Sequence, residues 1–223
     1  MLDQLFLDNL WIVLGVWGLI YCSDYGLTIV CARMYQGGVN KHLAFESFEL
    51  TPYYQKDVAR LRWISPRFLL MLCLTSLLLG AAWGMQSRVS SSDYTRQMFR
   101  GILGSLFFLE LAIHVRHFRN LLLFAYARRS LGIEGKVSYS SWLSYRSSAV
   151  DLAGFALLYL VGFLLTDNWF FGGGAIACFL LAFKHWSWST SRKAPAIVTE
   201  VDVVAEHAEH HARAAEDDAV ENA

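Results

Sequence analysis

Three ionisable residues lie along one face of a strongly apolar segment, residues 101–127. Glu110, His114 and His117 are four and three residues apart, so on an α-helix they fall within roughly 60° of one another. An ionisable side chain inside a bilayer costs about 2.5–3.5 kcal/mol on insertion scales, so it normally faces protein, water or a bound ion. Carboxylates and imidazoles bind cations, and imidazole also relays protons near neutral pH. The stripe therefore predicts a cation or proton site.

A second interpretation of the same segment is that the helix leaves the membrane near His114. His117, Arg116 and Arg119 would then lie among lipid headgroups, and only Glu110 would be deep. The two arginines point away from the stripe, because they fall on the other side of the helix. Under either interpretation, Glu110 is the residue that solvation explains least.

Asp24 is a second acid inside an apolar segment, just past the middle of residues 10–32. With Glu110 it is expected to form the charged core of the site, and Tyr25 is a candidate source of a hydroxyl group. Asp151 is a possible supporting residue. Its alternative role is to cap the helix of the fourth apolar segment, as the last residue of a sequence that resembles a capping box.

The composition places the chain among membrane proteins. It has 223 residues, 55% hydrophobic and 17% charged, with a mean hydropathy of +0.35. A bilayer-spanning helix needs about 20 predominantly apolar residues. Five segments meet or approach that length: residues 10–32, 68–85, 101–127, 150–166 and 169–186. The predicted fold is all-α, a polytopic membrane bundle of about five transmembrane helices.

Two pairs of residues mark helix starts between the first and second apolar segments. Thr51 with Pro52 places a capping hydroxyl before a proline at the first helical position, and predicts a helix over residues 53–64. This stretch mixes aromatic and cationic side chains and is expected to be an interfacial amphipathic helix. Ser65 with Pro66 repeats the pattern and predicts the start of the second span.

The neutral total charge is the sum of two unlike parts. Residues 1–193 carry +7 and residues 194–223 carry −7. The second part has no aromatic residue and is expected to be a disordered cytoplasmic tail. Its His207 and His211 would lie one turn apart on a helix, and are candidates for weak Zn²⁺ or Ni²⁺ binding.

Lys and Arg concentrate after the first and third apolar segments, which predicts that these two connections are cytoplasmic. The expected topology has five spans, the N-terminus outside and the C-terminus inside, in a bacterial-type plasma membrane. The first span is expected to be retained, because the acidic N-terminus is unlike a signal peptide. Membrane topology explains the basic charge, so no nucleic-acid partner is expected.

The residues favour a non-enzymatic protein that transports or conducts a cation or proton. No complete catalytic motif is present, and no cofactor is predicted beyond a bound cation. Two alternatives remain open: an accessory or assembly subunit of a larger membrane complex, and a membrane-embedded metalloenzyme using Glu110, His114 and His117. The small size favours a homo-oligomer or a complex with another membrane protein. Two glycine sets, Gly80 with Gly84 and residues 172–174, predict close helix packing.

Overall fold

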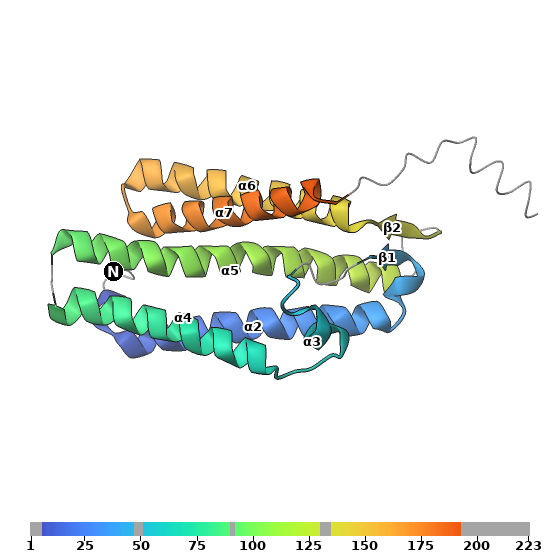
Figure 1. The fold of residues 1–223 in the computed structure, drawn as a ribbon, viewed down its shortest axis with the longest axis horizontal. Coiled ribbons are helices and arrows are strands. Elements are labelled where there is room, and N and C mark those ends of the chain that lie inside the picture. Colours follow the sequence, from blue (N-terminus) through green and yellow to red (C-terminus); the bar gives the residue numbers. More distant parts are fainter. Residues whose placement is uncertain (1–5, 47–50, 90–91, 130–134, 193–223) are drawn as a thin grey trace, which may run out of the picture. The chain divides into compact units, whose positions relative to one another are not determined.

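The computed structural model describes residues 6–46, 51–89, 92–129 and 135–192. These residues are mostly helical (Figure 1), which confirms the predicted helical architecture. Four helices are long and apolar enough to cross a membrane and suggest an integral membrane protein. They are α2 (Leu10–Gln36), α4 (Pro66–Gly84), α5 (Asp93–Arg128) and α6 (Ser141–Thr166).

The predicted fifth span forms α7 (Trp169–Thr190), a helix of 22 residues that is not among these four. Three consecutive glycines dilute the apolar character of its first half, and Lys184 and His185 lie near its end. A tight turn joins α7 to α6. There Asp167 has a left-handed backbone (φ 49°), and the side chain of Asn168 caps α7 by accepting from the amide of Phe170.

The remaining elements are short. They are η1 (Val39–Lys41), β1 (Leu43–Phe45), α3 (Gln55–Ala59), the π-helical turn η2 (Met85–Val89) and β2 (Val137–Tyr139). Strands β1 and β2 pair in parallel, so the all-α prediction missed a two-stranded sheet. They belong to the two long connections, and their pairing brings these connections together at one end of the bundle (Figure 1).

The two predicted helix starts before α4 have different outcomes. Ser65 is the N-cap of α4, accepting from the amide of Phe68 at 3.1 Å, with proline in the first turn as predicted. The predicted start at Thr51 is wrong. Helix α3 begins at Gln55, without a side-chain cap, and spans only five residues. The predicted amphipathic helix cannot continue to residue 64 because Leu61 adopts a positive φ of 51°.

Helix α6 begins nine residues before the predicted start of the fourth span. Ser140 is its N-cap and accepts from the amide of Leu143 at 3.3 Å. Asp151 therefore lies inside the helix, and its predicted role as a cap is wrong. The earlier start extends α6 toward the strands and places a row of serines beside α5 and α7.

Helix α5 lies between α2 with α4 on one side and the α6–α7 hairpin on the other (Figure 1). Glycine makes the approach of α5 to α7 possible. A Cβ added to Gly173 would lie 1.9 Å from the carbonyl oxygen of Gly101, and one added to Gly104 would lie 1.8 Å from that of Phe170. By contrast, no atom of the described residues lies within 4 Å of a Cβ added to Gly80 or Gly84, so these two glycines are not close-packing positions among those residues.

We expect Gly173→Ala to destabilise the bundle by about 3 kcal/mol, at the upper end of the usual overpacking range. The added methyl group meets backbone rather than a flexible side chain, so α5 and α7 must separate. Thermal unfolding of the purified protein in detergent measures the effect. Gly84→Ala is the matched control and should unfold at the parent temperature. Equal stability of all three proteins would contradict the packing described for α5 and α7.

Glu46 joins the end of β1 to the start of α6. Its Oε2 accepts from the backbone amide of Ser141 at 2.7 Å and from the Ser141 hydroxyl at 2.6 Å. Arg192, just after α7, donates to the same hydroxyl at 2.7 Å. The hydrogen bonds from Ser141 stabilise the carboxylate and lower the pKa of Glu46 below its usual value.

A depressed pKa makes the stabilisation by Glu46 dependent on pH. It is fully present above the ordinary glutamate pKa and is lost as pH falls through the lowered value in the folded protein. We expect Glu46→Gln to lower the unfolding temperature at pH 7, with the difference from the parent closing as the pH falls below the glutamate range. In a Ser141→Ala background, Glu46→Gln should have a smaller effect, because the carboxylate has lost the hydroxyl donor but keeps the backbone amide of residue 141. A difference that persists unchanged at low pH would contradict this role.

Candidate functional site

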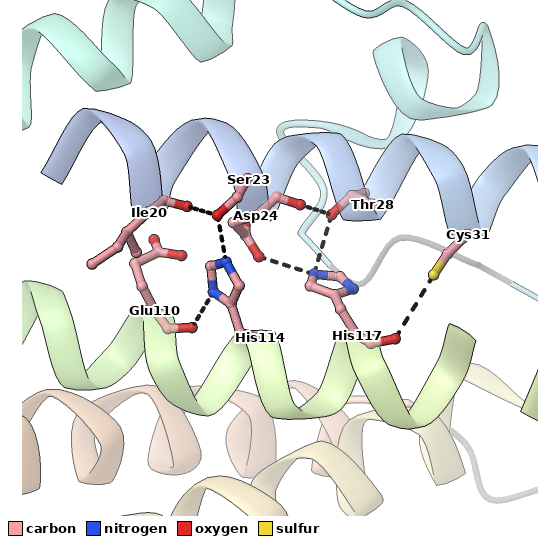
Figure 2. Close-up of polar contacts among 8 residues, drawn as sticks. All are labelled: Ile20, Ser23, Asp24, Thr28, Cys31, Glu110, His114 and His117. Carbon is pink, nitrogen blue, oxygen red and sulfur yellow. Dashed lines mark hydrogen bonds and ion pairs between the residues drawn. The ribbon is translucent and has the colours of Figure 1, made fainter. Parts of the chain in front are cut away.

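The candidate site lies where α2 and α5 pack side by side, running in the same direction (Figure 1). Asp24 and Glu110 are both near the middle of their helices. Each helix turns a row of residues with spacing i, i+4 and i+7 toward the other (Figure 2). The rows are Asp24, Thr28 and Cys31 on α2, and Glu110, His114 and His117 on α5. The structure thus brings the four predicted core residues together.

Asp24, Glu110 and His114 form the tightest group. One potential ligand atom from each lies within 4.8 Å of the other two. Glu110 is only 8% exposed, and its buried Oε2 has no hydrogen-bond partner among the described residues. The buried Oδ1 of Asp24 likewise accepts no hydrogen bond. Buried carboxylate oxygens are normally satisfied, so two unsatisfied oxygens within one group of side chains need an explanation.

His114 is held at both ring nitrogens (Figure 2). Its Nδ1 lies 2.8 Å from the backbone carbonyl oxygen of Glu110, and its Nε2 lies 2.8 Å from the hydroxyl oxygen of Ser23. A carbonyl oxygen can only accept, so Nδ1 carries the proton of this contact. In neutral His114, Nε2 then has a lone pair that points toward α2.

His117 fixes the orientation of Asp24. Its Nε2 lies 3.1 Å from Oδ1 of Asp24 and 3.1 Å from the hydroxyl oxygen of Thr28 (Figure 2). The Asp24 contact is within ion-pair distance but lacks the alignment of a hydrogen bond. The Thr28 hydroxyl also lies 3.1 Å from the backbone carbonyl of Asp24, to which it donates its single proton. The hydroxyl then accepts from Nε2–H, which assigns a proton to that nitrogen.

The charges of the site are unbalanced in the absence of a further positive charge. Two carboxylates this close in a largely apolar bundle repel one another much more strongly than they would in water. The nearest potential counter-charge, His117, is positive only when doubly protonated. The arrangement suits a proton or a metal cation shared between Asp24 and Glu110.

A cavity of about 430 Å³ reaches the site. Asp24, Glu110 and His117 line it, and it extends along α5 to the strand end of the bundle, where Phe45 and Tyr139 line it. Polar side chains of α5 and α6 complete much of the wall. A cavity with this lining has room and partners for water, so it gives the carboxylates a hydrated route to one end of the bundle.

An apolar layer lies on the other side of the two acids, toward the N-terminal ends of α2 and α5. Its buried residues are Val13, Trp17, Leu79, Ala82, Phe99, Leu103 and Phe107. The rings of Trp17 and Phe107 stack with centroids 6.1 Å apart. Trp17 also donates its indole N–H to the hydroxyl of Thr75 at 3.0 Å, which fixes the ring. Among the described residues, the cavity thus extends from the acids to the strand end, and this apolar layer lies on their other side.

Asp151 belongs to a different polar group on the opposite side of α5. Its Oδ2 lies 2.9 Å from Arg119 and 4.0 Å from Arg116, which confirms that these arginines point away from the stripe. Nearby, the Ser148 hydroxyl and Nδ1 of His185 lie 2.6 Å apart. Asp151 neutralises part of the arginine charge and has no contact with the Asp24 group among those described.

The remaining predicted residues are Tyr25 and the two histidines of the tail. Tyr25 lines the cavity, but its hydroxyl donates to the backbone carbonyl of Arg62 at 2.8 Å, and its ring stacks on Phe68. His207 and His211, with the whole predicted tail from residue 194, lie outside the described residues.

Ser23 and Thr28 are the site residues that the sequence analysis did not identify. Thr28 follows Asp24 by four residues and so shares its face of the helix, which is a signal the sequence contains. Ser23 is on an adjacent face, and only the closeness of α5 brings it to His114. Predicting that contact requires knowing which helices pack together.

No family model, curated protein or solved structure matches this chain. The chemistry of the site therefore rests on the geometry of its own residues.

We expect Glu110→Gln to fold and to be at least as stable as the parent at neutral pH. The amide keeps the shape of the side chain and removes one of the two neighbouring carboxylates. The loss of their repulsion can raise the free energy of unfolding by up to about 3 kcal/mol at an effective dielectric of 20. Thermal unfolding in detergent measures the change, and Glu110→Ala, which leaves a cavity, is the comparison. A large loss of stability in Glu110→Gln would show instead that the carboxylate holds the bundle together.

Proposed function

We propose that this protein carries a cation or a proton across a membrane, through the site formed by Asp24 and Glu110. One observation carries the proposal: Glu110 is buried at the middle of a long apolar helix, without a hydrogen-bond partner for Oε2, and faces a second acid across a cavity. An ionisable group at such a depth marks an ion or proton pathway more often than a structural contact.

Each residue has a distinct role in this proposal. Asp24 and Glu110 attract and hold the cation. His114 and His117 are ligands or relay groups on the side of the cavity, since imidazole both binds metals and exchanges protons near neutral pH. The cavity is the entry path from the strand end, and the layer around Trp17 and Phe107 separates the site from the other end.

We further propose five spans, with α7 crossing the membrane beside α6, the N-terminus outside and the C-terminus inside. Helix α7 matches most of the length of α6 and packs along it, which supports a transmembrane hairpin. The connections rich in Lys and Arg meet at the strand end, as expected of the cytoplasmic side. On this topology the cavity opens to the cytoplasm. We expect the working unit to be a homo-oligomer or a complex, because one chain offers little room for a complete pathway.

The placement of the two acids between α2 and α5 favours this function over an accessory subunit. An acid that pairs with a partner protein should face outward, yet Glu110 is buried and the Asp24 side chain, 20% exposed, projects toward α5 (Figure 2). A membrane-embedded metalloenzyme remains the second candidate. It is supported by the grouping of Asp24, Glu110 and His114 next to a cavity that could admit a substrate.

The proposal is tested with purified protein in liposomes that contain calcein, which Mn²⁺ quenches, or a pH-sensitive dye, under imposed gradients of Mn²⁺, Na⁺, K⁺ or H⁺. We expect the parent to move at least one of these ions. Glu110→Gln and Asp24→Asn should each lower the rate at least tenfold, because each removes one of the two charges that hold the ion.

The control is Asp93→Asn, which removes a fully exposed acid from the start of the same helix α5. It should leave the rate unchanged. Movement of none of the four ions, or full activity in Glu110→Gln, would refute the proposed transport.

A further inference from the structure

We infer that the cation is a divalent first-row transition-metal ion, bound by Asp24, Glu110 and Nε2 of His114. The inference rests on the proposed function and names the class of ion that the same site takes. His117 does not bind the ion directly and instead positions Asp24.

The donor set selects this class of ion. Two carboxylates supply two negative charges, which a dication balances and a monovalent ion does not. Sites for Mg²⁺ and Ca²⁺ are built from oxygen ligands, whereas imidazole nitrogen suits first-row transition ions such as iron, nickel, copper and zinc. A site with two carboxylates and an imidazole therefore favours a transition-metal dication over alkali and alkaline-earth ions.

The hydrogen bonds of His114 match those of a metal ligand. A metal-binding histidine usually donates its other ring N–H to a carbonyl or carboxylate, which sets the tautomer and directs the lone pair at the ion. In His114 this donor is Nδ1 and the acceptor is the Glu110 carbonyl, at 2.8 Å. Nε2 is thereby the nitrogen available to an ion, and it faces α2, which carries Asp24.

Ser23 can release Nε2 without losing a hydrogen bond. Its hydroxyl lies 2.8 Å from Nε2 of His114 and also 2.8 Å from the carbonyl oxygen of Ile20. The single hydroxyl proton can move from one acceptor to the other by rotation about the Cβ–Oγ bond. When an ion takes the Nε2 lone pair, the serine therefore keeps a full hydrogen bond within its own helix.

His117 has the opposite arrangement. Its Nε2 carries a proton directed at the Thr28 hydroxyl and lies beside Oδ1 of Asp24, so this nitrogen has no lone pair for the ion. The contact holds one oxygen of Asp24 and leaves the other to turn toward Glu110. Such partners of a metal ligand commonly affect metal affinity by 10–100-fold.

The spacing of the three donor atoms indicates a coordination shell that protein ligands fill only in part. Donor atoms in a tetrahedral zinc site are separated by about 3.4 Å, and opposite donors around a six-coordinate ion by about 4.2 Å, given bonds near 2.1 Å. The three donors here lie within 4.8 Å of one another, so a small side-chain rotation closes them around a six-coordinate ion. Water from the cavity completes the shell, and an ion held by three protein ligands can leave as well as enter.

The test uses the full-length protein in detergent with His207, His210 and His211 replaced by alanine, so that the tail does not bind metal. Binding of Mn²⁺ is followed by electron paramagnetic resonance, and a directly bound nitrogen is detected by spin-echo modulation. We expect about one Mn²⁺ per chain, with affinity reduced at least tenfold by Asp24→Asn, by Glu110→Gln and by His114→Ala. The Asp93→Asn control should bind like the parent.

The nitrogen signal separates the two histidines. It should disappear from residual binding in His114→Ala and remain in His117→Ala, whose affinity should fall about tenfold. An excess of Mg²⁺, Ca²⁺ or Na⁺ should not displace the bound ion. Failure to bind Mn²⁺ or Co²⁺ in a protein that still transports Na⁺, K⁺ or protons would overturn this inference and leave the proposed function standing. Tight Mn²⁺ binding without ion movement in liposomes would support this metal site and refute the proposed transport.

Discussion

The meeting of two carboxylates at the middle of two parallel, apolar helices is the constraint on which the site depends. Asp24 and Glu110 repel each other in the ionised state, and burial in an apolar bundle strengthens that repulsion. His117, whose Nε2 lies 3.1 Å from Oδ1 of Asp24, offsets this repulsion only when it is doubly protonated. Ser23 and Thr28 each have a backbone carbonyl as an alternative acceptor, and the histidines are oriented by the backbone and by a hydroxyl. The helices are therefore held together by other contacts, and the acids are left available for a ligand.

Those other contacts are provided on both sides of α5. The glycines of α5 and α7 let two backbones touch, and this close approach holds α5 against the α6–α7 hairpin, together with a hydrogen bond from the Ser105 hydroxyl to the Gly173 carbonyl at 3.0 Å. On the far side, stacked aromatic rings join α2 to α5 and α2 to α4, and the C-terminal half of α4 packs against the N-terminal halves of α2 and α5. Packing energy thus comes from apolar and backbone surfaces away from Asp24 and Glu110. This separation explains how the bundle tolerates unsatisfied carboxylate oxygens at its centre.

Much of this architecture follows from periodicity alone. The long apolar segments, the stripe of Glu110, His114 and His117, and the opposite direction of Arg116 and Arg119 all depend on the helical repeat, which a sequence shows directly. The Ser65 cap is equally local. The sequence could not show that α2 and α5 are neighbours, because apolar helix surfaces in a membrane protein are chemically alike. Ser23 was missed for that reason. The strands β1 and β2 were missed because three residues are too few to carry a period, and the interfacial helix was overestimated because Leu61 ends it through its backbone.

Along the helix axis, the site has a polar cavity on one side and an apolar layer on the other. This asymmetry supports the proposed transport more strongly than the donor atoms of the site do. A structural ion pair needs only its partners, and a closed metal site needs no water. Here the acids lie at the boundary between a polar cavity on one side and a layer of buried aromatic and aliphatic residues on the other. In the proposed transport, an ion that enters through the cavity reaches Asp24 and Glu110 hydrated, and goes further only when Trp17 and Phe107 separate. Since Trp17 is tied by one hydrogen bond to Thr75 and otherwise by ring contacts, its displacement costs packing but breaks no ion pair. A barrier of that kind can open while the charges of the site stay in place, which is the separation of gate and binding site that alternating access requires.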